Sequence, residues 1–232
     1  MASLIQSLFA SFGAENSAVY ELIREDIISG RLAANERLVV ADLAQRHETS
    51  TNPVREALQQ LRGEGFVVVT PNRGARVRPI DQDFVRDIYE IEMLIEPTLT
   101  RWFVSMITES DLAELERLQG DIEANNFADP VRHTELDAEF HGRMYFRHYN
   151  RHALDLWWKH REILHAISRT HPVTLARRVA VMKEHRELLK ALRAHDEDGA
   201  AAIVARHVEG SGRHLLEQMR VGSRRSPATS AA

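Results

Sequence analysis

The 232-residue chain contains no cysteine. Disulfide bonds and thiolate metal sites are therefore excluded, and the composition fits a reducing compartment, so we expect a cytoplasmic protein. No apolar run is long enough to cross a bilayer, and no membrane partner is expected. The start, MASLIQSLFASFGAENS, has an apolar patch but neither a basic lead-in nor a clear cleavage site, which does not fit a signal peptide.

An excess of basic residues is also missing. The chain has 30 Lys and Arg against 34 Asp and Glu, which gives a formal net charge of -4. Total charge therefore gives no indication of nucleic-acid binding, and any such function must come from a local basic patch. With 44% hydrophobic and 28% charged residues, the composition is that of a globular protein with room for one large domain or two small ones.

The first third of the sequence has the pattern of three helices followed by a β-hairpin. Residues 17–29 have apolar side chains at helical spacing and end before Gly30. The segment RLVVADLAQRHETSTNPVREALQQLRGEGF then contains two short helices around a tight turn. FVVVTPNRGARVRPI is rich in β-formers on both sides of a turn. We predict a winged helix-turn-helix over residues 16–80, preceded by an N-terminal tail over residues 1–15.

The second helix of the predicted helix-turn-helix has clear end signals. Ser50 is suited to cap its N-terminus, and Pro53 falls in the first turn, where no intrahelical hydrogen bond is lost. Gly63 and Gly65 are expected to end it.

From residue 81 onward the periodicity predicts helices only. They are expected over residues 83–104, 108–126, a segment that begins at Pro130, 150–169, 174–195 and 197–219. The apolar face of the first is expected at Phe84, Ile88, Ile91, Ile95, Leu99 and Trp102, with a kink at Pro97. We therefore predict a mainly α protein in which an all-α domain of six helices covers residues 81–222. The polar residues 223–232 are expected to form a disordered tail.

Three segments resemble known regulators. STNPVREALQQLRGEGFVVVTPNRGARV resembles the GntR family of winged-helix repressors, whose pattern is close to SRTPVREAL..L..EG followed by NRGA.V. LDAEFHGRMYFRHYNRHAL and EHRELLKALRAHDEDGAAAIVARH resemble the FCD effector domain of the FadR subfamily. The resemblance implies a ligand-responsive transcriptional regulator, expected to be a repressor, that binds a pseudo-palindromic operator in double-stranded DNA as a homodimer.

The helix that begins after Ser50 takes the place of the recognition helix. Such a helix inserts its N-terminal residues into the major groove, so Ser50, Thr51, Asn52 and Arg55 should face DNA. Arg55 can pair with guanine through two hydrogen bonds or bind a phosphate. The alternative is that Arg55 and Glu56 belong to an ordinary solvated helix face.

The predicted wing supplies the local basic patch. Arg73 and Arg76 lie on it, and Gly74 permits close approach to the DNA backbone. Two positions depart from the family pattern, because Thr51 stands where Arg is usual and Asn52 where Thr is usual. Thr51 cannot make the two-bond guanine contact, whereas Asn52 can read adenine, so the family's operator sequence cannot be assumed.

Four residues of the helical region have the pattern of a metal site. Asp137 and His141 are four residues apart and therefore share a helix face. His185 lies 11 residues before Asp196, in the turn of the last predicted helical hairpin, and His207 lies 11 residues after it. Residues equidistant from such a turn lie at the same height, so the two imidazoles can converge. One carboxylate and three imidazoles suit one divalent ion, Zn first and Ni, Mn or Co as alternatives. The FCD resemblance implies the same four residues.

Two other interpretations of these residues stay open. An isolated Asp-x-x-x-His is more often a salt-bridged pair, and zinc with an open position can activate water, as in a metal-dependent hydrolase or lyase. Against an enzyme, Glu139 and Glu184 each adjoin a ligand, but helical neighbours point about 100° apart, so no general base is evident. We expect no catalytic residue. The histidines expected at the surface or core edge are His133, His148, His152, His160, His165, His171, His195 and His214.

The effector is expected to be a small carboxylate-bearing metabolite that closes on the metal. Family members often carry Arg in a YE.R..LE segment, but this chain has YEIEMLIEP, with Glu92 at that position. Glu92 either lines the pocket, where it favours a hydroxyl, amine or water, or pairs with an arginine away from the ligand. Arg178, seven residues before His185, and Ser211, four after His207, are substitute candidates because each shares a face with a ligand.

Overall fold

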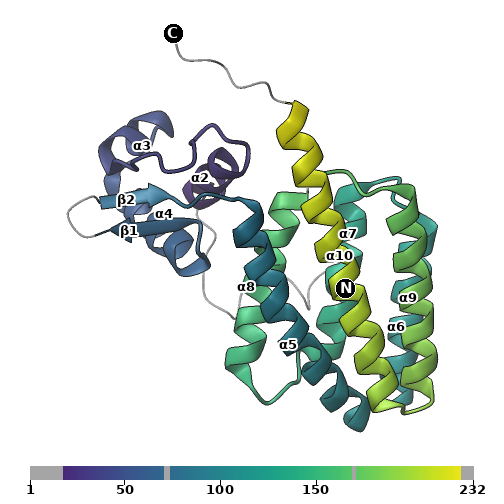
Figure 1. Ribbon diagram of the computed structural model, residues 1–232. Helices are drawn as coiled ribbons and strands as arrows, with labels where there is room; N and C mark the ends of the chain where they lie inside the picture. Colours follow the sequence, from purple (N-terminus) through teal and green to yellow (C-terminus); the bar gives the residue numbers. More distant parts are fainter. Residues whose placement is uncertain (1–17, 71–73, 169–170, 226–232) are drawn as a thin grey trace. The chain divides into compact units, whose positions relative to one another are not determined.

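The fold is described by a computed structural model that covers residues 18–70, 74–168 and 171–225 (Figure 1). The chain divides into two compact units, Met1–Asp81 and Gln82–Ala232. The division falls one residue after the boundary that the change from β-rich to helical sequence indicated. The expected N-terminal tail lies outside the described residues.

The first unit is a three-helix cluster with a two-stranded wing. Its elements are α2 (Ala18–Ile28), α3 (Val40–Arg46), α4 (Thr51–Glu64), β1 (Val67–Thr70) and β2 (Gly74–Val77). The strands pair antiparallel, with Val67 opposite Val77 and Thr70 opposite Gly74. Arg37 adds an isolated bridge to Arg76 on the far side of β2. This is the winged helix-turn-helix that the sequence predicts.

The ends of α4 agree with the sequence signals except at one glycine. Ser50 stands at the N-cap in an extended conformation, although its side chain makes no capping hydrogen bond to the described residues. Gly65 ends the helix with φ 91°, a left-handed conformation that glycine adopts without steric cost. Gly63, which we expected to help end the helix, lies inside it, because the turn needs only one left-handed residue.

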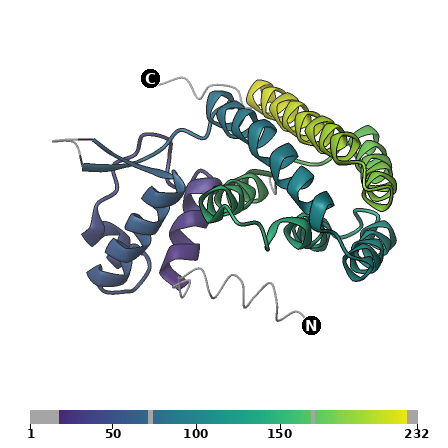
Figure 2. The same cartoon turned by 90° about the horizontal axis from the view of Figure 1, so that it is seen from below.

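The second unit is an all-α bundle. Its helices are α5 (Gln82–Met106), α6 (Glu109–Asn125), α7 (Pro130–Tyr145), α8 (Arg151–Ser168), α9 (Leu175–Arg193) and α10 (Glu197–Arg225). α5 and α10 run side by side, as Figure 2 shows, and α10 also packs against α9. α6 packs against α7 and α9, and α5 contacts α7 and α8. α10 continues through Arg225, three residues past the expected end of the domain, and the rest of the expected tail lies outside the described residues.

The starts of three helices follow from their capping residues. Thr108 and Asp111 form a reciprocal capping box at α6. The Asp129 carboxylate accepts a hydrogen bond from the Arg132 backbone N–H at the start of α7. Asn150 does the same for the Ala153 N–H at α8. These caps place the three helices where the sequence predicts them.

The buried face of α5 differs from the expected apolar one. Glu92 and Glu96 are buried, with 1% and 3% exposure, whereas Ile91 is 37% exposed. A carboxylate is buried only where it has polar partners, and α7 and α8 provide them here. The apolar pattern could not show this, because it gives no information about what the facing helices carry. Within the described ranges, no helix is long and apolar enough to cross a membrane.

Candidate metal centre and nucleic-acid interface

The four predicted metal ligands meet in the second unit. Asp137 and His141 come from α7, His185 from α9 and His207 from α10. One donor atom of each lies within 4.8 Å of the donor atoms of the other three. His141 and His185 are fully buried, at 0% and 1% exposure. The equal spacing of His185 and His207 from the turn at Asp196 therefore does bring their rings together, with centroids 4.9 Å apart.

Several donor atoms at this centre are buried and unsatisfied. Neither ring nitrogen of His141, nor Nε2 of His185, has a hydrogen-bond partner among the described residues. Asp137 Oδ1 lies 3.5 Å from His185 Nε2 and 3.9 Å from His141 Nε2, beyond hydrogen-bond distance of both. Burying such atoms without a partner is costly, and a shared cation would satisfy His185 Nε2 and one ring nitrogen of His141. The donor set fits a borderline divalent ion in composition and in placement.

Two of the imidazoles are oriented by an oxygen on the side away from the cluster. His185 Nδ1 lies 2.9 Å from Gln119 Oε1, and His207 Nδ1 lies 2.9 Å from Glu184 Oε2. When these nitrogens carry the proton and donate it, each Nε2 lone pair is free to bind a metal. The sequence argument dismissed Glu184 because it points away from its neighbour His185. Its contact is instead with His207 on the adjacent helix, which adjacency in sequence does not indicate.

Arg177 holds Glu184 in place. Its Nη1 donates to Glu184 Oε1 at 3.0 Å, and its Nη2 donates to the His207 carbonyl and to Ser211 Oγ, both at 2.9 Å. The close approach depends on Gly210, because a Cβ there would lie 2.6 Å from Arg177 Nη1. Ser211, a predicted effector residue, is therefore bonded to an arginine behind His207.

Arg178, the other substitute candidate, has different contacts. Its Nε donates to the Val173 carbonyl at 3.0 Å, and its guanidinium lies over the Phe127 ring, 5.0 Å from the centroid. The structure thus brings Arg177, rather than Arg178, to the ligand side of α9. The effector role of Arg178, which lies seven residues before His185, stays a prediction.

Burial sets the protonation of the centre. It lowers the pKa of His141 well below its usual value and that of His185 to about 3. Burial alone would raise the pKa of Asp137, but the Arg161 charge and the nearby imidazoles outweigh it and hold that pKa well below the usual value. Neutral imidazoles beside an ionised carboxylate are the forms that bind a metal ion.

Two polar residues beside the ligands were missed from the sequence. Arg161 on α8 forms an ion pair with Asp137 Oδ2 and lies over the Trp157 ring at 5.5 Å. Glu96 Oε2 on α5 lies 3.8 Å from His141 Nδ1 and accepts a hydrogen bond from the Tyr145 hydroxyl at 3.3 Å. Burial raises the pKa of Glu96 to about 7. Glu96 lies one turn after Glu92, a spacing that could have drawn attention to it, but no sequence signal ties α8 to the ligands.

Glu92 pairs with a histidine, not with an arginine. Its Oε1 lies 2.5 Å from His160 Nδ1, and both side chains are buried. Burial raises the pKa of Glu92 to about 8 and lowers that of His160 to about 4. Near neutral pH the pair therefore consists of a carboxylic acid and a neutral imidazole.

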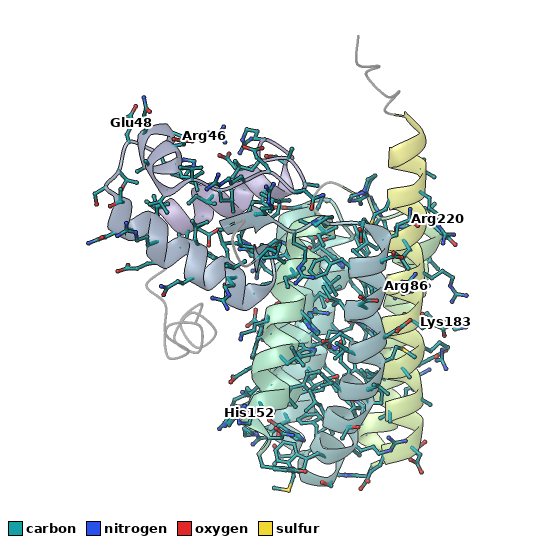
Figure 3. The ribbon with its side chains drawn as sticks, turned by 60° about the vertical axis from the view of Figure 1, so that its left-hand side comes forward. Arg46, Glu48, Arg86, His152, Lys183 and Arg220 are labelled. Atoms are coloured by element: carbon teal, nitrogen blue, oxygen red, sulfur yellow. The ribbon has the colours of Figure 1, made fainter. Side chains whose placement is uncertain are left out.

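The expectation that the remaining histidines lie at the surface or core edge is wrong for three of them. His133, His148 and His160 are buried, His165, His171 and His214 are partly buried, and His152 and His195 are exposed. Figure 3 shows His152 at the outer edge of the bundle. The buried three have aromatic or carboxyl neighbours: His133 stacks on Phe127 and His148 meets Trp102.

In the first unit, the start of α4 is open. Ser50, Thr51, Asn52 and Arg55 are all exposed, whereas Val54 is buried on the opposite side of the helix. Glu48 in the turn before α4 and Arg46 at the end of α3 are exposed too, and Figure 3 shows both side chains projecting outward. The residues predicted to face DNA therefore form one accessible surface.

Of the predicted wing residues, Gly74 is exposed and Arg76 makes a hydrogen bond within the unit. Gly74 is exposed and has φ 75°, a conformation that side chains rarely adopt. Arg76 is partly buried, and its Nη1 donates to the Asn35 carbonyl at 2.7 Å, which ties the wing to the preceding loop. Arg37 is exposed beside Gly74 and adds a basic group that the sequence analysis did not consider. Arg73 lies outside the described residues.

A winged helix-turn-helix followed by a helical bundle with a ligand-type centre is the architecture of a DNA-binding transcriptional regulator. Comparison with protein families agrees with it. The bacterial regulatory proteins of the gntR family match residues 15–77, and the FCD domain matches residues 87–210, more than half of the chain. The chain belongs to the GntR family, as a FadR-type regulator with an FCD domain.

Individual relatives are regulators of the same kind. The chain is 26% identical to the Nta operon transcriptional regulator of Aminobacter aminovorans, over 83% of this chain and 90% of that protein. It is 26% identical to the galactonate operon transcriptional repressor of Escherichia coli, over 83% of this chain and 93% of that one. The solved structure of E. coli McbR/YncC has the same fold, with a TM-score of 0.67 at 20% identity, covering 89% of this chain and 99% of that chain.

Proposed function

We propose that this regulator is a repressor that binds a pseudo-palindromic operator as a homodimer and responds to a small carboxylate-bearing metabolite. The metabolite binds at one divalent metal ion held by Asp137, His141, His185 and His207. The observation that carries the proposal is the meeting of these four donors in the bundle, with unsatisfied nitrogens on His141 and His185. Zn is the first candidate, and Ni, Mn or Co are the alternatives.

The metal supplies what an acidic effector needs. Asp137, His141, His185 and His207 would hold the ion, and a carboxylate would suit any further position that the ion offers. The Nδ1 atoms of His185 and His207, which point away from the cluster, already contact Gln119 and Glu184. An effector must therefore approach from the side of the cluster.

The DNA-binding part of the proposal rests on the exposed start of α4. Ser50, Thr51, Asn52 and Arg55 contact base edges and phosphates in the major groove, and Arg73 and Gly74 approach the backbone from the wing. Arg76 acts through its bond to the Asn35 carbonyl, which fixes the wing. A two-fold dimer presents two such surfaces to the two halves of the operator.

The alternative, a metal-dependent hydrolase or lyase, requires a general base next to the metal. Glu184 contacts the metal-ligand candidate His207 through the ring nitrogen that points away from the cluster. Both of its oxygens are engaged, one by Arg177 and one by His207. It holds an imidazole in orientation and is not placed to take a proton from water. Glu96, whose pKa burial raises to about 7, also lies beside the ligand His141, but it accepts a hydrogen bond from Tyr145, and an enzyme would leave the winged helix-turn-helix without a role.

Operator binding with and without metal tests the proposal. An operator selected from random DNA is titrated with the full chain while a panel of small carboxylates is screened for one that changes the affinity. The expected change is about 5–150-fold, which is the usual size of such coupling. It should disappear in metal-depleted protein and in His141→Ala, and persist in His152→Ala, an exposed histidine outside the cluster. An acid that shifts operator affinity equally with and without metal would overturn the metal-centred mechanism.

A further inference from the structure

The two oxygens of Asp137 have different neighbours. Oδ1 lies towards the histidines, 3.5 Å from His185 Nε2 and 3.9 Å from His141 Nε2. Oδ2 is bound by Nη2 of Arg161. The exposed fractions are small, 20% for the Arg161 side chain and 16% for that of Asp137. A guanidinium therefore lies beside the carboxylate that would bind the metal.

Charge at this centre is unbalanced once a metal is bound. A divalent ion brings two positive charges and Arg161 a third, whereas Asp137 supplies one negative charge and the three imidazoles are neutral. Glu184 does not change the balance, because it is paired with Arg177. Even an ionised Glu96 leaves an excess of positive charge. Excess charge in a buried site is stabilised by a counter-ion, and an anionic ligand is the natural one.

The other arginines near the centre are already engaged. Arg177 donates to Glu184, the His207 carbonyl and Ser211, and Arg178 is directed at Val173 and Phe127. Position 92, where relatives often carry an arginine, holds a glutamate bonded to His160. Arg161 binds Asp137 through Nη2, and a planar guanidinium has further N–H donors for a second carboxylate.

We infer that Arg161 and the metal ion together anchor the effector's carboxylate. When no metal is bound, Arg161 remains paired with Asp137, the residue that would bind the metal. The inference rests on the proposed metal centre and adds the second anchor of that site. α8, rather than α5, supplies the arginine that recognises the acid. In the metal-free chain the same guanidinium neutralises Asp137 and so competes with the incoming ion.

This arrangement gives Arg161 opposite effects on the two ligands. Its charge repels a divalent ion and its ion pair holds Asp137, so removing it should strengthen metal binding. The same substitution removes a guanidinium that can donate two hydrogen bonds to the effector's carboxylate, so effector binding should weaken. A residue that only supports the fold would weaken both when removed, which makes the sign of the metal effect informative.

The experiment uses the full chain, stripped of metal, with Co²⁺ as the metal and acetate as the carboxylate probe. Cobalt absorption reports metal binding, and its change on adding acetate reports entry of the carboxylate into the coordination sphere. In Arg161→Gln, Co²⁺ should bind about tenfold tighter or more, because a nearby positive charge is lost. The acetate midpoint should rise by about tenfold or more, because a charge-assisted contact is lost.

Two further variants complete the test. Arg193→Gln removes the same charge from an exposed arginine that pairs with Glu116, eight residues beyond His185 on α9, and both affinities should stay at wild-type values. Arg161→Lys keeps the charge without the planar fork, and should weaken acetate while leaving Co²⁺ unchanged. If Arg161→Gln does not fold, Arg161→Lys alone decides the matter by the acetate midpoint.

Three outcomes count against the inference. A parallel loss of Co²⁺ and acetate binding in a folded Arg161→Gln would assign Arg161 a supporting role only. Wild-type acetate midpoints in both Arg161 variants would remove it from the carboxylate site while leaving the metal centre intact. A wild-type chain that binds no Co²⁺ would overturn the metal centre itself, and with it this inference.

Discussion

Single buried polar residues carry most of what is specific to this regulator. The bundle places Glu92 against His160, Glu96 beside His141 and Arg161 on Asp137, and each contact joins helices that are distant in sequence. Apolar periodicity identifies a buried face, but it cannot show which polar groups will find partners there. These contacts therefore had to come from the structure.

The Glu92–His160 pair makes the stability of the bundle depend on pH. Burial raises the folded-state pKa of Glu92 to about 8, from an ordinary value near 4.5. A raised pKa contributes stability that is complete below 4.5 and is lost as the pH rises through about 8. Glu92→Gln removes this contribution. Between pH 6 and 8 the free energy of unfolding of wild type should fall by about 2 kcal/mol relative to the variant.

Urea unfolding of both proteins at several pH values measures the difference directly. His160 adds the opposite dependence at lower pH, because its lowered pKa makes stability fall as the pH drops from about 6.5 towards 4. The comparison is therefore confined to pH 6 and above. Parallel curves for wild type and Glu92→Gln over that range would show that Glu92 is ionised in the folded bundle.

Arg55 is the residue whose loss should most affect operator recognition. It is exposed near the start of α4, where a recognition helix meets base edges. Arg55→Ala should cost about 1–3 kcal/mol of operator binding and leave the fold intact. Arg62→Ala, in the last turn of the same helix, removes the same charge at a distance from the groove and should have little effect. Mobility shifts that rank Arg62 above Arg55 would reverse the orientation of the helix on DNA.

At the scale of elements, the contact between α5 and α10 depends on a glycine. α5 and α10 pack side by side, and a Cβ at Gly212 would lie 2.7 Å from Cγ of Tyr89. Gly212→Ala should therefore lower the free energy of unfolding by about 1–3 kcal/mol, because the helices must move apart. Gly120→Ala is the matched control, since Gly120 is a helical glycine with nothing within 4 Å of its Cβ position.

The control has its own expected sign. Alanine reduces the freedom of the unfolded chain, so Gly120→Ala should raise the free energy of unfolding by about 0.5–1 kcal/mol. Denaturant unfolding compares the two variants under one condition. Stabilisation by both would mean that the ring of Tyr89 moves aside without cost, and that the α5–α10 contact is looser than the structure shows.

The elements themselves were largely predictable. Caps at Thr108, Asp129 and Asn150, and a stop at Gly65, mark helix ends through local chemistry. The equal spacing of His185 and His207 from the turn between α9 and α10 also predicted their convergence, because an antiparallel hairpin fixes height by counting. The same counting did not show that Arg177, the neighbour of Arg178, would contact Glu184 and His207.

At the scale of the whole molecule, the net charge of the chain does not indicate where its functional surfaces lie. A formal charge of -4 does not show that the start of α4 is exposed in one unit, or that Asp137 and three histidines meet in a largely buried cluster in the other. Neither feature shows in the composition. Both followed from short motifs whose spacing is meaningful only within an assumed helix or hairpin.

The metal content of the purified chain tests the central claim most directly. We expect about one divalent ion per chain in wild type, as a site of four protein donors should hold. His185→Ala and His207→Ala should lose most of it. His148→Ala and His214→Ala should retain it, because His148 Nδ1 accepts a hydrogen bond from the Asn150 N–H and His214 lies two turns beyond His207. Elemental analysis that finds metal retained without His185 or His207, or none in zinc-reconstituted wild type, would contradict the account.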